Sequence, residues 1–423
     1  MEKKRAVLVS RIDNSNKKPN IEEFKALAKA AGYDVVRVII QKRKEDPKYN
    51  IGVGKVEELD KIIKEENIER VIFFNSLKPV QILNLKEKLR VEVIDRFQLI
   101  LEIFAKHAGS REAKLQIELA KLRYELPRIR EWVRRAKMRE LPGFVRGPGS
   151  YQVDVYYKSI LRRITKIRRE LEEIRKHKSL HRKVRKSMGF PLIVLTGYTN
   201  AGKTTLFNRL TKESKPVSNI PFSTLATVTR LIDINGRKAL ISDTIGFIDN
   251  LPPLLIESFY TTLEEIRYAD LLLMVIDSSE PVSEIKRKIR ASIGILGEVG
   301  VISRPTIAVL NKIDLISEEE LKERINIVRE YYEKVVPLSA QLRINMNLLK
   351  RTIYNNLPKY ERIVLKVQNL NDIDFLGNFK FLKINNIVEN DDGVLLEIEG
   401  PEETLMKLHG YLRSQNKEIV IVP

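Results

Sequence analysis

The 423-residue chain contains no cysteine, which excludes a disulfide framework and any zinc or iron–sulfur site with thiolate ligands. It also lacks a run of about eighteen apolar residues that could span a membrane. The basic N-terminus lacks the apolar core of a secretory signal, because charge returns at Arg11. The four histidines show no metal-ligand spacing. These absences predict a cytoplasmic protein with no membrane partner.

The net charge of +20 is unevenly distributed along the chain. Residues 101–190 contain 25 basic and 10 acidic side chains, so about a fifth of the chain holds a net charge of +15. A charge that served only solubility would be spread more evenly. Its concentration in one segment indicates a polyanionic partner, RNA in particular. A solvated helix face is the alternative explanation for such a run.

Short apolar strands alternate with helical patterns in residues 1–104. Strands are expected at 6–9, 35–40, 71–74 and 92–95, and helices at 21–31, 56–66 and 79–89. This alternation predicts a small parallel α/β domain. A second α/β alternation covers residues 191–358, and residues 359–423 have the pattern of a small α+β domain with a last strand at 418–422. The predicted fold class is therefore multidomain α/β.

Residues 105–190, which we call the basic hairpin, carry two seams of apolar residues at alternating steps of three and four. A loop rich in proline and glycine separates the seams, which predicts two antiparallel helices that bury their stripes on each other. Pro127 is expected to kink or restart the first helix. The basic side chains lie outside the seams. Those predicted to contact RNA, at or near the tip, are Arg134, Arg135, Arg139 and Arg146.

A buried-strand pattern at 191–196 leads directly into Gly-Tyr-Thr-Asn-Ala-Gly-Lys-Thr and a helix. This is the G-x-x-x-x-G-K-[ST] phosphate loop in its strand–loop–helix setting. The glycines let backbone N–H groups turn toward a phosphate, and the helix N-terminus adds a favourable dipole. The predicted nucleotide ligands in this loop are Gly197, Tyr198, Thr199, Asn200, Ala201, Gly202, Lys203, Thr204 and Thr205. Lys203 is expected to bridge the β- and γ-phosphates, and Thr204 to bind Mg²⁺.

Two later strands end in further nucleotide motifs. Asp243 closes an apolar strand, so it is expected to hold Mg²⁺ through water, and Gly246 is expected to donate its N–H to the γ-phosphate. Asp314, in the motif Asn-Lys-Ile-Asp, can accept both guanine N1–H and the 2-amino group, which adenine does not offer. The other predicted residues of the base pocket are Asn311, Lys312, Ser339 and Ala340. The order of the motifs predicts a P-loop domain that binds GTP and GDP.

The leading candidate for the switch threonine is Thr224, which would sense the γ-phosphate and bind Mg²⁺. Thr227 and Thr229 are the alternatives. With Lys203 and Gly246, Thr224 makes up the predicted catalytic set. Release of the loop that carries this threonine would be the switching event on hydrolysis.

The position after Gly246 is Phe247, where Ras-like proteins have a glutamine that orients water. Phenylalanine cannot do this by hydrogen bonding, so we expect slow intrinsic hydrolysis that something external completes. Asn200 resembles the asparagine that helps to hold K⁺ in some cation-activated GTPases. A role in shaping the loop is the alternative for Asn200.

The chain resembles the HflX family of ribosome-associated GTPases, in its archaeal form, over nearly its whole length. Beyond the phosphate loop, the resemblance is carried by Gly52-Val-Gly-Lys, Val93-Ile-Asp-Arg, Tyr124-Glu-Leu-Pro-Arg, Arg146-Gly-Pro-Gly and Asp243-Thr-Ile-Gly-Phe. Bacterial members continue Arg-Gly-Pro-Gly with Glu-Thr-Gln, where this chain has Ser-Tyr-Gln. The resemblance implies a large-ribosomal-subunit partner, GTP hydrolysis stimulated by that subunit, and a role in ribosome splitting or rescue.

Two rival functions stay open at this point. One is an ATP-driven RNA-remodelling protein that uses the N-terminal domain, because the Asn-Lys-Ile-Asp motif argues against ATP only in the second α/β domain. The other is a GTP-gated RNA-binding regulator with little catalysis, which Phe247 keeps open. We expect a monomer.

Overall fold

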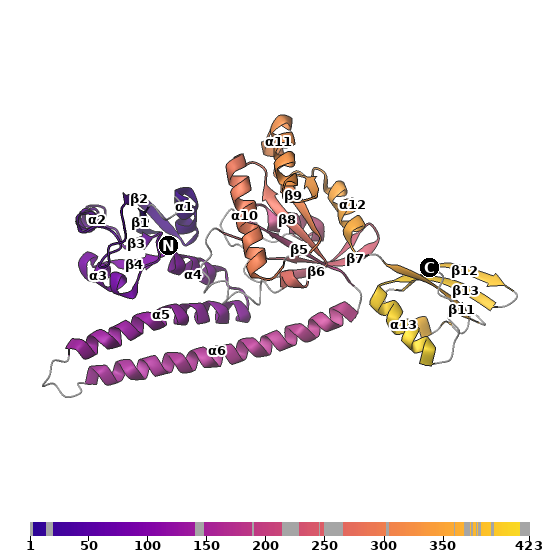
Figure 1. Ribbon diagram of the computed structural model, residues 1–423, viewed down its shortest axis with the longest axis horizontal. Coiled ribbons are helices and arrows are strands. Elements are labelled where there is room, and N and C mark those ends of the chain that lie inside the picture. Colours follow the sequence, from indigo (N-terminus) through magenta and orange to yellow (C-terminus); the bar gives the residue numbers. More distant parts are fainter. Residues whose placement is uncertain are drawn as a thin grey trace. The chain divides into compact units, whose positions relative to one another are not determined.

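The computed structural model describes residues 3–13, 20–139, 148–187, 190–213, 228–244, 246–248, 265–301, 304–358, 360–367, 373, 375–377, 379, 382–390 and 393–414. The chain divides into two compact units. Of the described residues, unit 1 takes those up to Glu173 together with 244 and 246–248, and unit 2 takes the remainder. Figure 1 colours the elements along the sequence. The four-domain division expected from the sequence stays a prediction.

A parallel four-stranded sheet with the order β2-β1-β3-β4 forms the centre of unit 1. Its strands are β1 (Lys4–Ile12), β2 (Tyr33–Lys42), β3 (Arg70–Phe73) and β4 (Glu92–Asp95). The helices between and after them are α1 (Ile21–Ala30), α2 (Val53–Glu65), α3 (Pro79–Leu89) and α4 (Arg96–His107). Because helices cover both faces, β1 is buried on both. Ala6 and Leu8 belong to the core with α1 and α4. Val7 and Val9 belong to the core with α2 and α3.

The basic hairpin consists of α5 (Arg111–Arg139) and α6 (Pro148–Ser187), which run antiparallel in Figure 1. Several of the predicted seam residues are buried, among them Leu115, Leu119, Ile160, Ile164 and Ile167. The arginine fork of Arg163 donates to both oxygens of Glu118, at 2.6 and 2.7 Å, and Arg111 pairs with Glu170 at 2.8 Å. These ion pairs fix which turn of α6 lies beside which turn of α5.

The predicted restart of the first hairpin helix at Pro127 is wrong, because α5 continues through this residue. Proline removes one backbone N–H, but buried side chains in the neighbouring turns, such as Ile129, hold the helix together through packing. Arg134, Arg135 and Arg139 lie on the last turns of α5. Arg146 lies outside the described residues.

Tyr124 of α5 anchors the basic hairpin to the parallel sheet of unit 1. Its hydroxyl donates to the carboxylate of Asp95, a fully buried side chain that also accepts the backbone N–H groups of Leu77 at 3.3 Å and Gln98 at 3.1 Å. The Tyr124 ring stacks on Phe97 with 4.2 Å between centroids. Burial raises the pKa of Asp95 above its usual range. The first helix of the hairpin is therefore held by a buried polar contact as well as by apolar packing.

Unit 2 contains a six-stranded sheet with the order β10-β9-β8-β5-β7-β6, parallel except for β6. Its strands are β5 (Leu192–Gly197), β6 (Val228–Ile234), β7 (Arg237–Asp243), β8 (Leu271–Asp277), β9 (Thr306–Asn311) and β10 (Lys334–Pro337). Its helices include α7 (Lys203–Thr211), α10 (Val282–Glu298), α11 (Glu318–Arg329) and α12 (Met346–Asn356). The carboxyl ends of its parallel strands bring together the loops that carry the predicted nucleotide motifs.

The C-terminal part of unit 2 is a three-stranded antiparallel sheet with the order β11-β13-β12. It consists of β11 (Glu361–Val367), β12 (Lys383–Asn390) and β13 (Gly393–Gly400), followed by α13 (Glu402–Ser414). The strand predicted at 418–422 lies outside the described residues. The predicted fold class, multidomain α/β with a small α+β tail, is confirmed. Within the part of the chain that the structure describes, no helix has the length and apolarity to cross a bilayer.

Replacing Tyr124 with phenylalanine removes the hydroxyl that donates to Asp95 and leaves the stacked ring in place. A buried acceptor that loses a partner costs about 1–3 kcal/mol, so we expect the free energy of unfolding, measured in urea, to fall by that amount. Tyr157→Phe is the matched control, because its hydroxyl accepts from Arg130 on the exposed face of the hairpin. The control should cost less than ~0.5 kcal/mol. Equal losses in the two variants would contradict the anchoring role.

Candidate nucleotide-binding site

The phosphate loop joins β5 to α7, and both of its motif glycines are required by the local geometry. Gly197 has φ +133°, and a Cβ there would lie 2.3 Å from the backbone oxygen of Val275. Gly202 has φ +91°, and a Cβ there would lie 2.2 Å from the side-chain nitrogen of Asn311. A larger residue at either position would meet both a strained backbone and a collision. The loop therefore packs tightly against β8 and against the end of β9.

Lys203, the first residue of α7, is buried inside the phosphate loop. Its ammonium group donates to the backbone oxygens of Gly197 at 3.1 Å and Tyr198 at 2.7 Å. The pKa of Lys203 is lowered to about 8, chiefly by burial; the carboxylate of Asp243 opposes this shift, and the nearby charge of Lys288 adds to it. The loop carbonyls thus hold the ammonium group where a phosphate would be bound.

Thr204 and Asp243 face each other at the start of α7 and the end of β7. The Thr204 hydroxyl donates to the carboxylate of Asp243 at 3.1 Å, and the Asp243 side chain is fully buried. A hydroxyl and a carboxylate are hard oxygen donors of the kind that Mg²⁺ prefers. The two residues therefore fit the predicted magnesium site, in which Thr204 would bind the ion directly and Asp243 through water.

Asn311, at the end of β9, joins three loops through one buried side chain. Its amide nitrogen donates to the Ala201 backbone oxygen at 2.9 Å, and its amide oxygen accepts the Ala340 N–H at 3.0 Å. Its backbone oxygen accepts both the N–H and the hydroxyl of Ser278, at 2.9 and 2.7 Å. The phosphate loop, the base loop (residues 311–314) and the loop that contains Ser339 and Ala340 are therefore held in one arrangement.

The other residues of the predicted base pocket lie around Asn311. Asp314 is exposed at the edge of the site, within a short 3₁₀ turn, Ile313–Leu315. The Ser339 hydroxyl accepts the Leu342 N–H at 3.1 Å, which closes the turn that presents Ala340. Arg209 of α7 donates to the Ala340 backbone oxygen at 3.1 Å. The backbone N–H of Ile313, next to Asp314, donates to the Leu338 oxygen at 3.4 Å, so the base loop lies beside the segment that leads into Ser339 and Ala340.

The structure does not bring every predicted residue together. Gly246 belongs to unit 1, and its role at the γ-phosphate stays a prediction. The next residue, Phe247, is only 2% exposed, and Ile248 is part of the core of unit 1 with α1 and α4. Thr224 and Thr227 lie outside the described residues. The Thr229 hydroxyl donates to that of Ser242 at 3.3 Å, so it is already engaged within the sheet.

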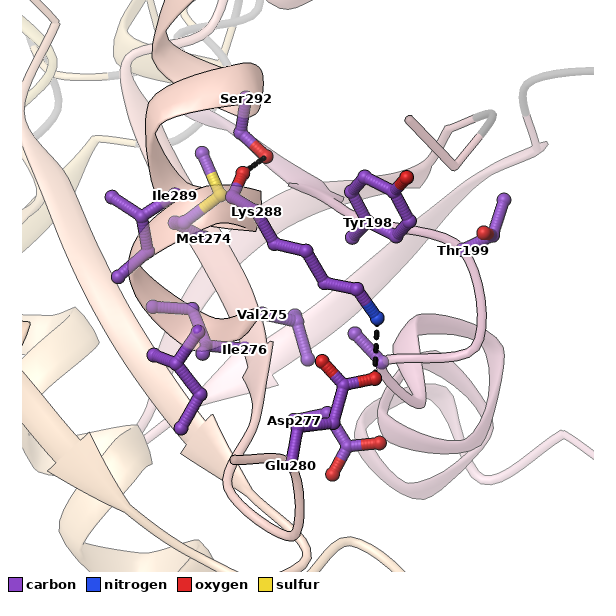
Figure 2. Close-up of a pocket in the computed structure, with 12 residues that line it drawn as sticks. Tyr198, Thr199, Met274, Val275, Ile276, Asp277, Glu280, Lys288, Ile289 and Ser292 are labelled. Carbon is purple, nitrogen blue, oxygen red and sulfur yellow. Dashed lines mark hydrogen bonds and ion pairs between the residues drawn. The ribbon is translucent and has the colours of Figure 1, made fainter. Parts of the chain in front are cut away.

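A pocket beside the phosphate loop contains residues that the sequence analysis missed (Figure 2). Lys288 of α10 places its ammonium group 4.6 Å from the ring centroid of Tyr198 and forms an ion pair with Glu280. Asp277, at the end of β8, pairs with Lys312 at 2.5 Å. No short motif signals these contacts, because they join residues that are distant in the sequence and adjacent only in the folded sheet.

Three family models match consecutive segments of the chain. A model described as "GTP-binding GTPase N-terminal" matches residues 18–105, and one described as "GTP-binding GTPase Middle Region" matches residues 107–185. A model described as "50S ribosome-binding GTPase" matches residues 192–312. Together they cover unit 1 from residue 18 onward, nearly all of the basic hairpin and the nucleotide motifs up to Lys312.

Curated relatives extend the likeness over nearly the whole chain. The chain is 43% identical to a GTPase HflX of Thermofilum pendens over 405 residues, which cover 95% of each protein. It is 46% identical to a GTPase HflX of Thermococcus kodakarensis over 356 residues, 81% of this chain and 80% of that protein. A crystal structure of the protein SsGBP in complex with GDP is similar at 35% identity and a TM-score of 0.50, covering 83% of this chain and 98% of that one.

The lowered pKa of Lys203 predicts a pH-dependent affinity for GDP. Bound phosphate would raise the pKa of this lysine again. At a pH where part of the nucleotide-free protein has a neutral Lys203, GDP binding should therefore be accompanied by uptake of a proton. Affinity should therefore fall as pH rises through about 8, by up to tenfold per pH unit. Titration calorimetry in two buffers of different ionisation enthalpy would measure both the affinity and the proton uptake. Lys203→Arg keeps its charge and should give a flat profile. A flat profile in the unmodified protein would show that Lys203 does not titrate here.

Replacing Asp314 with asparagine exchanges an acceptor for a side chain that can also donate. The guanine N1–H and 2-amino group lose their paired acceptor, so we expect the affinity for GDP to fall about 100-fold, equivalent to about 2.7 kcal/mol. Xanthosine diphosphate, which presents an oxygen in place of the amino group, should gain affinity. Glu318→Gln, at the exposed start of α11, is the charge-matched control and should leave both affinities unchanged. An unaltered base preference in the Asp314 variant would refute this assignment.

Proposed function

The chain belongs to the HflX family of GTPases and hydrolyses GTP, and we propose that it is a switch protein that binds the large ribosomal subunit and acts in ribosome splitting or rescue. The proposed nucleotide ligands are the loop and strand-end residues described above, together with Gly246. Thr224 is the proposed γ-phosphate sensor, and Lys203 the proposed transition-state cation. The description of the model that matches residues 192–312, which names ribosome binding, supports the choice of partner.

The observation that carries this proposal is the burial of Phe247. The residue at the position that orients water in Ras-like proteins is apolar and 2% exposed, and its neighbour Ile248 packs in the core of unit 1. Rotation of a buried phenylalanine toward the nucleotide would supply no hydrogen bond to water. The group that completes hydrolysis must therefore come from elsewhere in the chain or from a partner. A partner that supplies it would couple hydrolysis to its own presence.

The basic hairpin provides the surface through which such a partner could be bound. Exposed basic side chains of α6 include Arg162, Lys166 and Arg169, whereas Arg163 is paired with Glu118 of α5. The remaining positive charge favours RNA phosphates, because their counterions are released on binding. Arg134, Arg135, Arg139 and Arg146 are the proposed contacts nearest to the tip. A hairpin anchored at Tyr124 would transmit the position of its tip to unit 1.

Two cations fit the proposed reaction. Mg²⁺ would be held by Thr204 and Thr224 directly and by Asp243 through water, where it would neutralise charge on the phosphates. K⁺ could be held by Asn200, which is exposed and has φ +63° in the phosphate loop. We propose that the protein acts as a monomer in the cytoplasm. An ATP-driven activity in unit 1 is not supported by a motif comparable to the nucleotide motifs of unit 2. The second candidate function is a GTP-gated RNA-binding regulator with little catalysis, because of Phe247.

The proposal predicts that GTP turnover by the purified protein is slow and rises at least ~100-fold when large ribosomal subunits are added. The measurement is phosphate release with GTP or ATP, in K⁺ and in Na⁺ buffers, with and without the subunits. A K⁺ effect without subunits would support Asn200 as a cation ligand. If the subunits do not stimulate hydrolysis in either salt, the hypothesis of a ribosome-activated GTPase is ruled out, and the GTP-gated RNA-binding regulator becomes the favoured function.

The role of the hairpin charge in this stimulation is tested with a pair of variants. Replacing Arg134, Arg135 and Arg139 together with glutamine should abolish most of the stimulation and reduce its salt dependence, while GDP affinity stays unchanged. Replacing three exposed basic residues outside the hairpin with glutamine, Lys322 and Arg329 of α11 and Arg351 of α12, removes the same charge and should leave stimulation intact. Equal stimulation of both variants would show that these hairpin arginines are not needed for activation by the ribosomal subunit.

A further inference from the structure

Asp277 lies at the end of β8, one strand away from the base loop, and no nucleotide motif includes it. Its side chain is only 9% exposed. The parallel register pairs Asp277 with Asn311, so the residue after Asn311 extends directly over the end of β8. That residue is Lys312, and its ammonium group lies 2.5 Å from one carboxylate oxygen of Asp277.

The carboxylate of Asp277 is itself held in place. Its second oxygen accepts the backbone N–H of Ser279 at 3.0 Å and the Ser279 hydroxyl at 2.6 Å. The adjacent Ser278 donates twice to the backbone oxygen of Asn311. The end of β8 is therefore fastened to the end of β9 by backbone contacts, and the Asp277 carboxylate has one fixed orientation toward Lys312. Figure 2 shows Asp277 beside Glu280 at this corner of the fold.

Lys312 combines an unusual backbone conformation with a partly exposed side chain. Its φ is +67°, in the left-handed region that residues other than glycine rarely adopt. About a quarter of its side chain is exposed. A free lysine there would sample many rotamers, and holding its stem flat against a base would cost rotamer entropy on every binding event. An ion pair at the far end of the stem reduces that cost in advance.

We propose that Asp277 is a positioning residue for guanine recognition, which holds the aliphatic stem of Lys312 in the orientation that packs along the base. The inference rests on the proposed placement of Lys312 in the base pocket. Asp277 contacts no nucleotide in this scheme and acts only through the lysine. Its effect falls on the base and is independent of the number of phosphates, so GDP and GTP are affected alike.

The test is a double-mutant cycle on GDP affinity. Asp277→Asn keeps the size of the side chain and removes its charge, and should weaken GDP binding about tenfold, or about 1.4 kcal/mol. Lys312→Met keeps an apolar stem and removes the ammonium group. If Asp277 acts through Lys312, adding Asp277→Asn to Lys312→Met should weaken binding by less than about twofold. Thermal unfolding of each nucleotide-free variant shows whether the fold is intact.

One result would overturn the proposal. A tenfold loss from Asp277→Asn that persists in the Lys312→Met background would mean that the carboxylate shapes the loop and not the lysine. The assumption beneath the proposal is tested separately by Lys312→Ala, which removes the stem: if this variant leaves GDP affinity unchanged, the lysine does not contact the base, and both ideas fall.

Discussion

The nucleotide site depends on one buried amide more than on any charged group. Asn311 donates to the phosphate loop and accepts from the Ala340 loop, while its backbone oxygen is bonded to the end of β8. A buried amide that lost these partners would leave a donor and an acceptor unsatisfied, at a cost of about 1–3 kcal/mol for each group. The glycine at position 202 follows from the same contact, since its missing Cβ leaves the space that the amide occupies. The phosphate and base subsites are thus built as one structure.

The groups that are predicted to meet a phosphate or a metal ion are each bonded to another part of the site. Lys203 is held by two loop carbonyls, and the Thr204 hydroxyl is held by Asp243. Each of these contacts uses the group that is predicted to meet a phosphate or a metal ion.

How far the sequence could predict this arrangement depends on the range of each interaction. The phosphate loop and the base loop were predictable because the chemistry of a bound nucleotide fixes residue types at short spacing. The hairpin was predictable because two heptad seams can bury themselves only on each other. The pairing of Asp277 with Lys312 was not, because it depends on the register of β8 against β9. The helix does not restart at Pro127, one of the two outcomes expected there, because local propensity yields to packing along a long helix.

Residues 246–248 link the chemistry of one unit to the packing of the other through the chain itself. Asp243 ends a strand of unit 2, and five residues later Ile248 is buried in the core of unit 1 beside helices α1 and α4. Five residues of chain can span at most about 18 Å, so Asp243, the proposed Mg²⁺ ligand, and Ile248 are joined by a short segment. If Gly246 senses the γ-phosphate as proposed, a change in this segment on hydrolysis would act next to a residue of the unit 1 core. Because Tyr124 joins that unit to the basic hairpin, the same short segment is where nucleotide state and RNA contact would be coupled.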